Sequence, residues 1–124
     1  MRHERGEVSA ESVIIVPVVF FVLLRGVQAT TLFHAANIAT AAAAQGASAA
    51  AASGASELDG ERVASISVAE LGGSLSSPPK VDLRSDWVAV TVRISVPQII
   101  PGFPRVIERN VIERKERFVG ELDR

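Results

Sequence analysis

The side chains that most often perform catalysis are scarce in this chain. It contains no cysteine and two histidines, His3 and His34, which excludes thiol chemistry, cysteine-bound zinc and disulfides. His34 stands in an alanine-rich segment without a serine or carboxylate at helical spacing, so we interpret it as a helix-face histidine and not as a ligand. The acidic residues at 57–61 are typical of a helix start. We therefore expect no catalysis, no metal or cofactor, and no small-molecule substrate.

One acidic side chain, Glu11, has an unusual setting. The residues that follow it, 12–24 (SVIIVPVVFFVLL), include no charged residue. A carboxylate costs about 2.5–3.5 kcal/mol at the centre of a membrane helix, and less near its end. Glu11 therefore either marks the membrane interface or pairs with a positive group in a protein assembly. Its neighbours favour the second interpretation, because Arg5-Gly6 directly precedes the polar pentapeptide EVSAE, which ends at Glu11.

The segment that must position Glu11 is a long helix. Residues 8–24 carry only that one charge and approach the roughly 20 residues that a membrane-spanning helix needs. The arginine at position 25 can snorkel, so the span can continue beyond it. Of residues 35–55, 13 are alanine, the strongest helix former. We expect one helix from about Val8 to about Ala55, about 70 Å long, which Pro17 kinks but does not end.

The remaining residues predict a small head with an antiparallel sheet. Residues 88–96 alternate in the manner of a strand with one buried face. The residues of that face are Val88, Val90, Val92, Ile94 and Val96. Val81 and Leu83 alternate with charged residues in the same way. The repeated VIER motif predicts an edge strand over residues 105–119, with a frayed helix as the alternative.

Residues 61–75 suit a second helix that ends at Gly72-Gly73, although alternation over 64–68 leaves a strand open. The apolar residues of its helical face are Ala64, Val68, Leu71 and Leu75. The sequence thus predicts an α+β fold: a long N-terminal membrane-spanning α-helix, then a head with about three strands and a short second helix. The net charge is -1, from 13 basic and 14 acidic residues. Without a basic excess, we expect no nucleic-acid partner.

The N-terminal pattern resembles a prepilin-type signal, in which a membrane peptidase cuts after a glycine and a glutamate occupies the fifth mature position. RGEVSAESVIIVP further resembles the start of TadE-like pseudopilins, which are type IV pilin-like proteins of the tight-adherence (Flp/Tad) pilus system. Those proteins share a basic leader, an early proline and an alanine-rich helix. The tail DWVAVTVRISVPQIIPGFP is similar to their C-terminal strand and proline-glycine loop.

This resemblance implies a leader of residues 1–6, a transmembrane and alanine-rich helix of residues 7–56, and an extracytoplasmic head of residues 57–124. Cleavage would fall between Gly6 and Glu7. Glu11 would then neutralise the new amino group of a neighbouring subunit. The residues expected to pack between membrane helices are Val13, Ile14, Pro17, Phe20, Phe21 and Leu24.

The implied protein is a single-pass protein of the cytoplasmic membrane with its basic leader inside and its head outside, able to enter an extracellular pilus. Its partners would be the prepilin peptidase, other pilins or pseudopilins, the membrane assembly platform and membrane lipid. Glu7 stands where pilins usually carry a hydrophobic, often methylated residue. Major Flp pilins tend to have tyrosine where this chain has Ser12, and they lack a head of this size. The serine at position 12 and the presence of a head both favour a minor pseudopilin.

Two other interpretations of the N-terminus stay open. A conventional signal peptide would use residues 13–24 as its apolar core and be cleaved after Ala29, releasing a secreted binding module. Its start carries three acids against two arginines, whereas signal peptides start with positive charge. An uncleaved anchor would hold an unrelated small domain at the membrane. The N-terminal residue of the mature protein separates the three possibilities: Glu7, Thr30 or Met1.

Overall fold

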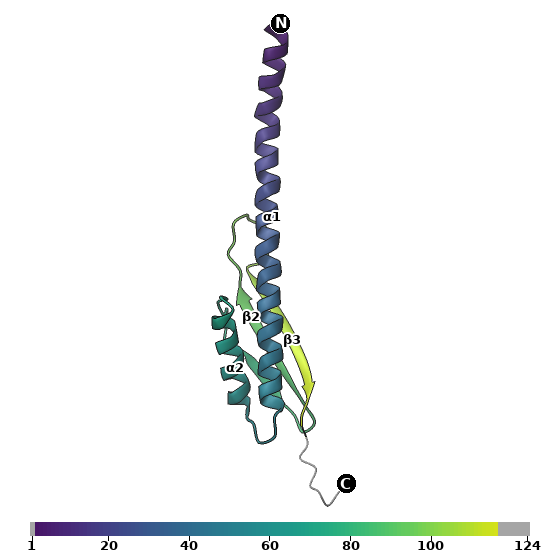
Figure 1. Cartoon of the computed structure of the whole chain (residues 1–124), viewed down its shortest axis with the longest axis vertical. Helices are drawn as coiled ribbons and strands as arrows, with labels where there is room; N and C mark the ends of the chain where they lie inside the picture. The colour runs from purple at the N-terminus through teal and green to yellow at the C-terminus, as the bar shows by residue number, and fades with distance from the viewer. Residues whose placement is uncertain (1, 117–124) are drawn as a thin grey trace, which may run out of the picture.

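The chain folds as one long helix whose second half forms the axis of a small head (Figure 1). The computed structural model describes residues 2–116, with side chains from residue 9 onward. Its elements are helices α1 (Arg2–Ala51) and α2 (Glu57–Glu70) and strands β1 (Lys80–Leu83), β2 (Trp87–Ser95) and β3 (Val106–Arg114). The strands form one antiparallel sheet in the order β1-β2-β3. The predicted α+β architecture is confirmed.

Helix α1 starts earlier and ends earlier than the sequence predicted. It begins at Arg2 and ends at Ala51, and the chain turns away from it through Gly54, whose φ is 79°. Its 50 residues correspond to a length of about 75 Å. The helix continues through Pro17, as expected. Figure 1 shows a nearly straight rod, so the kink expected from that proline is slight.

The core of the head forms between the alanines of α1 and the valine face of β2. All five residues predicted for that face, from Val88 to Val96, are buried. The buried hydrophobic residues of α1 are Ala35, Ile38, Ala39, Ala42, Ala43, Ala47, Ala50 and Ala51. Small side chains let the sheet and α2 approach the helix axis closely, because interaxial distance depends on the side chains at the contact. The second half of α1 is therefore part of the head's core and not a separate stalk.

Helices α1 and α2 approach each other closely at two glycines, Gly46 of α1 and Gly60 of α2. A Cβ atom at Gly46 would lie 2.9 Å from the Gly60 backbone oxygen and 2.9 Å from the Ala64 Cβ. A Cβ atom at Gly60 would lie 2.9 Å from the Ala50 Cβ and 3.1 Å from the Gly46 oxygen. Neither position can accept a side chain without movement of the backbone.

Helix α2 begins with a capping box. The Ser56 hydroxyl accepts a hydrogen bond from the Asp59 backbone N–H at 3.4 Å, and the Asp59 carboxylate accepts one from the Ser56 backbone N–H at 2.8 Å. This arrangement satisfies two amides that the helix leaves without partners. The backbone N–H of Ser56, its hydroxyl and the more distant Arg62 all lower the pKa of Asp59.

The end of α2 explains why residues 61–75 were ambiguous. The helix occupies Glu57–Glu70, so the helical interpretation is correct but its range lies earlier in the chain. Gly72 has a φ of 82°, and the Gly73 N–H donates to the Val68 carbonyl at 2.9 Å, which together close the helix in a Schellman turn. Leu75 lies beyond that turn and forms a β-bridge with Ile94.

The VIER repeat forms β3, as predicted, and β3 is an edge strand. It pairs with β2 along its whole length, from Trp87 opposite Arg114 to Ser95 opposite Val106. Only the range differs from the prediction: Val106–Arg114 is strand, and residues 117–119 of the predicted segment lie outside the described residues. Two charged residues of β3 stand opposite valines of β2, Arg109 opposite Val92 and Glu113 opposite Val88. Charges on the buried-face side of an edge strand disfavour pairing with another chain.

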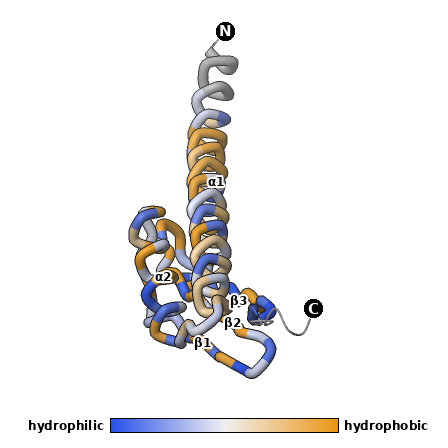
Figure 2. The backbone as a smooth tube through the Cα atoms, turned by 60° about the horizontal axis from the view of Figure 1, so that its bottom comes forward, coloured by the Kyte–Doolittle hydropathy of each residue, from blue (hydrophilic) through white to orange (hydrophobic). Residues whose placement is uncertain are grey.

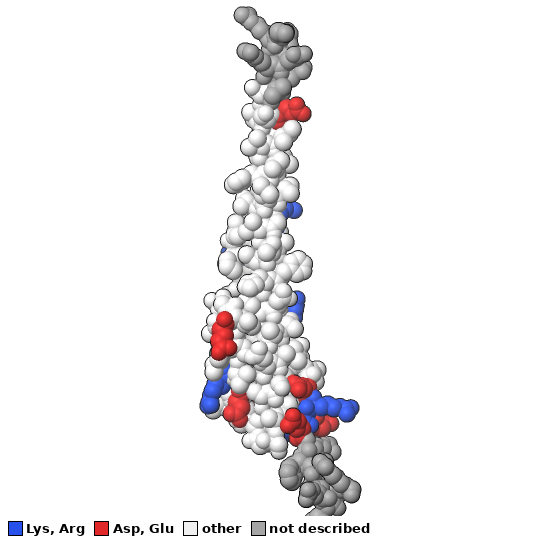
Figure 3. Space-filling model, in the orientation of Figure 1, with Lys and Arg blue, Asp and Glu red and all other residues white. Residues whose placement is uncertain are grey.

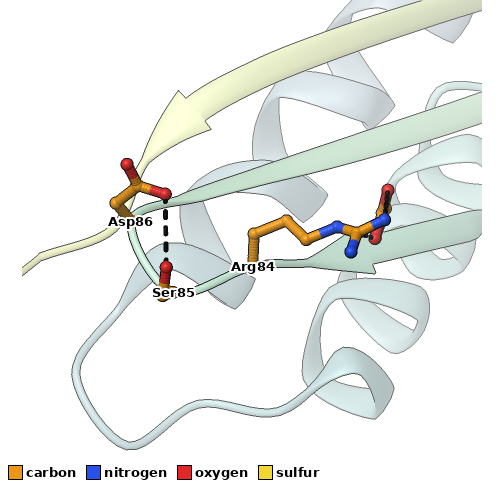
Figure 4. A network of polar contacts seen from close by, with 4 residues as sticks. Arg84, Ser85 and Asp86 are labelled. Carbon is orange, nitrogen blue, oxygen red and sulfur yellow. Dashed lines mark hydrogen bonds and ion pairs between the residues drawn. The ribbon is translucent and has the colours of Figure 1, made fainter.

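The turn between β1 and β2 is polar and lies at the end of the head that points away from the projecting part of α1 (Figures 1 and 4). The Arg84 Nε lies 3.0 Å from Asp82 Oδ1, and the Ser85 hydroxyl lies 3.5 Å from Asp86 Oδ1. The Arg84 guanidinium also lies over the Trp87 ring, 5.9 Å from its centroid.

We expect Gly46→Ala to destabilise the head. Overpacking costs about 1–3 kcal/mol, which exceeds the roughly 1 kcal/mol that alanine gains over glycine in a helix. The control is Gly26→Ala in the same helix, because a Cβ there meets nothing within 4 Å. Thermal unfolding of the full chain in detergent, followed by circular dichroism, should show a lower Tm for Gly46→Ala alone. Equal Tm values would contradict the close contact between α1 and α2.

The capping box of α2 is expected to make the stability of this helix depend on pH. Because the folded-state pKa of Asp59 is lowered, the ionised carboxylate stabilises the cap above its unfolded-state pKa. That contribution is lost as the pH falls through the folded-state pKa. An NMR titration should place the Asp59 midpoint below that of an unfolded peptide, and Ser56→Ala should raise it. An unchanged midpoint in Ser56→Ala would exclude the hydroxyl contact.

Candidate functional site

Residues 13–24 of α1 project from the head and form an uninterrupted apolar segment (Figure 2). The face drawn in Figure 3 carries no charged side chain over this segment. The large exposed residues from position 13 to position 27 are Val13, Ile14, Ile15, Val16, Val18, Val19, Phe20, Phe21, Val22, Leu23 and Val27. A helix that is apolar all round is normally buried in a protein core or in a membrane. Here the described part of the chain offers it no core: Val13 is 72% exposed and Ile14 is 68% exposed.

The described residues contain one helix that is long and apolar enough to cross a membrane, within Ser9–Ala51. Only 6% of its most apolar window is buried, which distinguishes it from the core helix of a soluble domain. The length and exposure of this segment are compatible with a single-pass membrane protein.

The residues predicted to pack between membrane helices share one side of α1. Successive helical residues are rotated by about 100°, so the six positions fall within about a third of the circumference. Five of them are exposed and Leu24 is half-buried. The six residues are Val13, Ile14, Pro17, Phe20, Phe21 and Leu24.

Glu11 is exposed near the start of the described side chains. Helical spacing places Glu11 on the same side of α1 as Ile15, Val18 and Val22. The predicted packing residues lie on a different side of the helix. Gly6 and Glu7 lie in the first turns of α1, where side chains fall outside the described residues. The structure therefore brings the predicted cleavage position and Glu11 onto one continuous helix, about two turns apart at most.

Arg25 interrupts the apolar surface, and the structure shows how it is accommodated. Its guanidinium carbon lies 4.8 Å from the centroid of the Phe21 ring, one turn earlier in α1. Such a cation–π contact is attractive and keeps the charged head close to the helix surface. The sequence expectation that Arg25 does not end the helix is correct, since α1 continues to Ala51.

The junction between the apolar segment and the head is formed by Gln28, which is 0% exposed. Its Oε1 accepts hydrogen bonds from the backbone N–H of Ile99 at 2.7 Å and of Ile100 at 3.4 Å. Its Nε2 donates to the Pro97 carbonyl at 3.1 Å. One side chain of α1 thus holds the backbone of the loop between β2 and β3.

The family comparison agrees with this description of α1. Residues 6–48 match the family model of TadE-like proteins. This segment is TadE-like. No curated protein and no solved structure matches the chain.

The TadE-like segment begins at the predicted cleavage glycine and ends just beyond Gly46. It contains Glu11, the apolar surface, Arg25 and Gln28, and it leaves out α2 and the sheet. The match therefore covers about the first third of the chain and concerns α1 alone.

His34 fits the interpretation made from the sequence. It is exposed on α1 and lies at the rim of a shallow groove with Ile38, Ile94 and Pro97. Among the side chains of residues 9–116, no group of three or more histidine and acidic residues is placed to hold a metal ion.

Sequence reasoning missed Gln28 and the glycine pair. The only signal for Gln28 is that a lone amide stands between apolar residues, in LLRGVQA. Its partners are three residues of a loop about 70 positions later, which no local pattern reveals.

We expect Gln28→Leu to loosen the loop between β2 and β3. The substitution leaves the Ile99 and Ile100 amides without their acceptor, and a lost buried hydrogen bond typically costs about 1–3 kcal/mol. Hydrogen exchange should accelerate at these two amides while the Val92 amide, in the middle of β2, keeps its protection. Unchanged exchange at residue 99 would mean that Gln28 does not hold the loop.

Proposed function

We propose that the chain is a minor pseudopilin of a Tad-type pilus, which is held in the cytoplasmic membrane by α1 and contributes to pilus assembly. The observation that carries this proposal is the apolar surface on every side of the projecting half of α1, within a TadE-like segment. A helix of this kind requires lipid or neighbouring helices around it. A pilin-like subunit would meet both: lipid while it is in the bilayer, and neighbouring helices once it is in the filament.

The proposed processing is cleavage between Gly6 and Glu7 by a prepilin peptidase. The leader, residues 1–6, contains Arg2 and Arg5, and positive residues favour the cytoplasmic side of a membrane. The helix from residue 7 to Ala51 then forms the membrane segment and the core of the head, and the rest of the head lies on the outer side of the membrane. Cleavage removes both arginines and creates an amino group at Glu7.

Glu11 is proposed to neutralise that amino group in a neighbouring subunit. Within its own mature chain, Arg25 lies 14 residues further on, about 21 Å along the helix axis. Gln28, where α1 enters the head, lies about 25 Å away by the same measure. The head therefore offers Glu11 no charge partner within reach. The chain's own new amino group lies four residues before Glu11, about 6 Å along the axis, and a neighbouring subunit that is shifted along the filament axis brings a second amino group to the same level.

The secreted alternative requires cleavage after Ala29, and the junction argues against it. Such a cut would remove Gln28, which is fully buried and bonded to three residues of the loop after β2. It would also divide α1 inside a continuous helix. A signal peptide has no role in the fold of the mature protein, whereas this segment contributes to the head's own contacts.

The first test is the N-terminal residue of the protein recovered from membranes and from sheared pili, identified by mass spectrometry. Glu7 at the N-terminus is the expected result. Gly6→Leu should block processing and leave the chain starting at Met1. Recovery of a chain that starts at Thr30 would instead identify a secreted protein and overturn the proposal.

The second test concerns assembly. Glu11→Ala should insert into the membrane normally and be cleaved, but it should be depleted from sheared pili by about tenfold or more, as the loss of a charge pair in a low-dielectric site would produce. Ser12→Ala, at the neighbouring exposed position, is the control. Normal incorporation of Glu11→Ala into pili would show that no such pairing operates.

A further inference from the structure

We propose that the loop of residues 97–104 between β2 and β3, called here the proximal loop, rests in the interfacial layer of the same bilayer that α1 crosses, with Ile99 directed into it. The proposal rests on the proposed membrane insertion of α1. It adds a second membrane contact, made by the head itself.

The height of the proximal loop follows from its bonds to Gln28. A side chain in an α-helix tilts toward the helix N-terminus, so the Gln28 amide lies at the level of the preceding turn, residues 24–27. The Ile99 N–H lies 2.7 Å from that amide oxygen. Figure 1 shows the loop as the part of the head that reaches furthest along the projecting half of α1.

That level coincides with the outer end of the apolar segment. A span of about 30 Å requires about 20 helical residues, which corresponds to residues 8–27. The outer boundary of the hydrocarbon then falls at Val27, one residue before Gln28. The proximal loop is consequently held at the boundary and not above it.

The composition of the proximal loop suits that layer. Its sequence, PQIIPGFP, contains no charged residue and three prolines, and Ile99 is 46% exposed. Unsatisfied backbone groups are what makes a loop costly near lipid. Three of these eight residues have no N–H to satisfy, and Ile99 and Ile100 already donate to Gln28.

The base of the loop is also closed by hydrogen bonds. The Val96 N–H donates to the Arg105 carbonyl at 2.7 Å, and the Arg105 Nε donates to Gln98 Oε1 at 2.7 Å. Arg105 places a positive charge directly after the loop, where anionic lipid headgroups attract it. The turn at the opposite end of the sheet is charged and polar, in contrast to the proximal loop. It consists of Arg84, Ser85 and Asp86 (Figure 4).

The test uses the full chain in vesicles of phosphatidylcholine and phosphatidylglycerol. The chain has no cysteine, so Ile99→Cys, Ile112→Cys and Phe20→Cys can each carry one nitroxide spin label. Ile112 is the matched control, an isoleucine that is 67% exposed in β3. Collision rates with oxygen, which enters lipid, and with a water-soluble nickel chelate report the depth of each label.

The label at residue 99 should collide with nickel several-fold less often than the label at residue 112, and more often than the label at residue 20. Equal nickel accessibility at residues 99 and 112, with residue 20 in lipid, would overturn the loop proposal and leave the membrane helix intact. A water-exposed label at residue 20 would overturn membrane insertion itself, and the loop proposal with it.

A second measurement covers the case in which the label disturbs the loop. The single tryptophan, Trp87, can be replaced by phenylalanine, and Ile99→Trp or Ile112→Trp introduced in that chain. Lipids brominated near the headgroup should quench tryptophan fluorescence at residue 99 and not at residue 112. Equal quenching at both positions would overturn the proposal.

Discussion

The head depends on one packing constraint, which is that it has no hydrophobic core without α1. The buried face of β2 consists of valines and one isoleucine, and what covers it is the alanine face of α1. Helix α2 reaches the same surface only because Gly46 and Gly60 have no side chains. A sheet with one apolar face must bury that face against another element. The sheet, the second helix and the loops are therefore all arranged around the second half of a helix whose first half projects from the head (Figure 1).

Helix α1 changes in the kind of side chain it carries at the point where it enters the head. Before Gln28, α1 exposes large apolar side chains on every side, and after it the buried side chains are mostly alanine. Gln28 stands at the change, with its polar atoms used entirely by the loop backbone. A buried amide whose oxygen and nitrogen are both hydrogen-bonded is tolerated in a dry site, whereas an unpaired one is costly. The TadE-like match covers both sides of this change.

The features that were predicted correctly from the sequence are those that a local pattern of residue types reveals. The alternation from Val88 to Val96 identified β2 and its buried face, and the alanine content identified the second half of α1. The VIER repeat gave the correct strand, and Gly72 marked the end of α2. The acidic residues at 57–61 indicated the start of α2, but they did not identify its capping box, because Ser56 and Asp59 are each common in loops as well.

The contacts that the sequence could not predict join distant positions. Nothing in the local sequence indicates that Gly60 faces Gly46. Gln28 looked like a lone polar residue, because its partners follow a sheet whose position depends on the whole fold. Glu11 was noticed by its surroundings alone, and its partner belongs to another molecule in the function proposed here.

The unbroken course of α1 from Arg2 to Ala51 has a mechanical consequence. No loop separates the projecting part of this helix from the part that lies inside the head, so the two are joined as one continuous rod. A change in the direction of the projecting part is therefore a change in the direction of the head's own core, with no linker between them to absorb it.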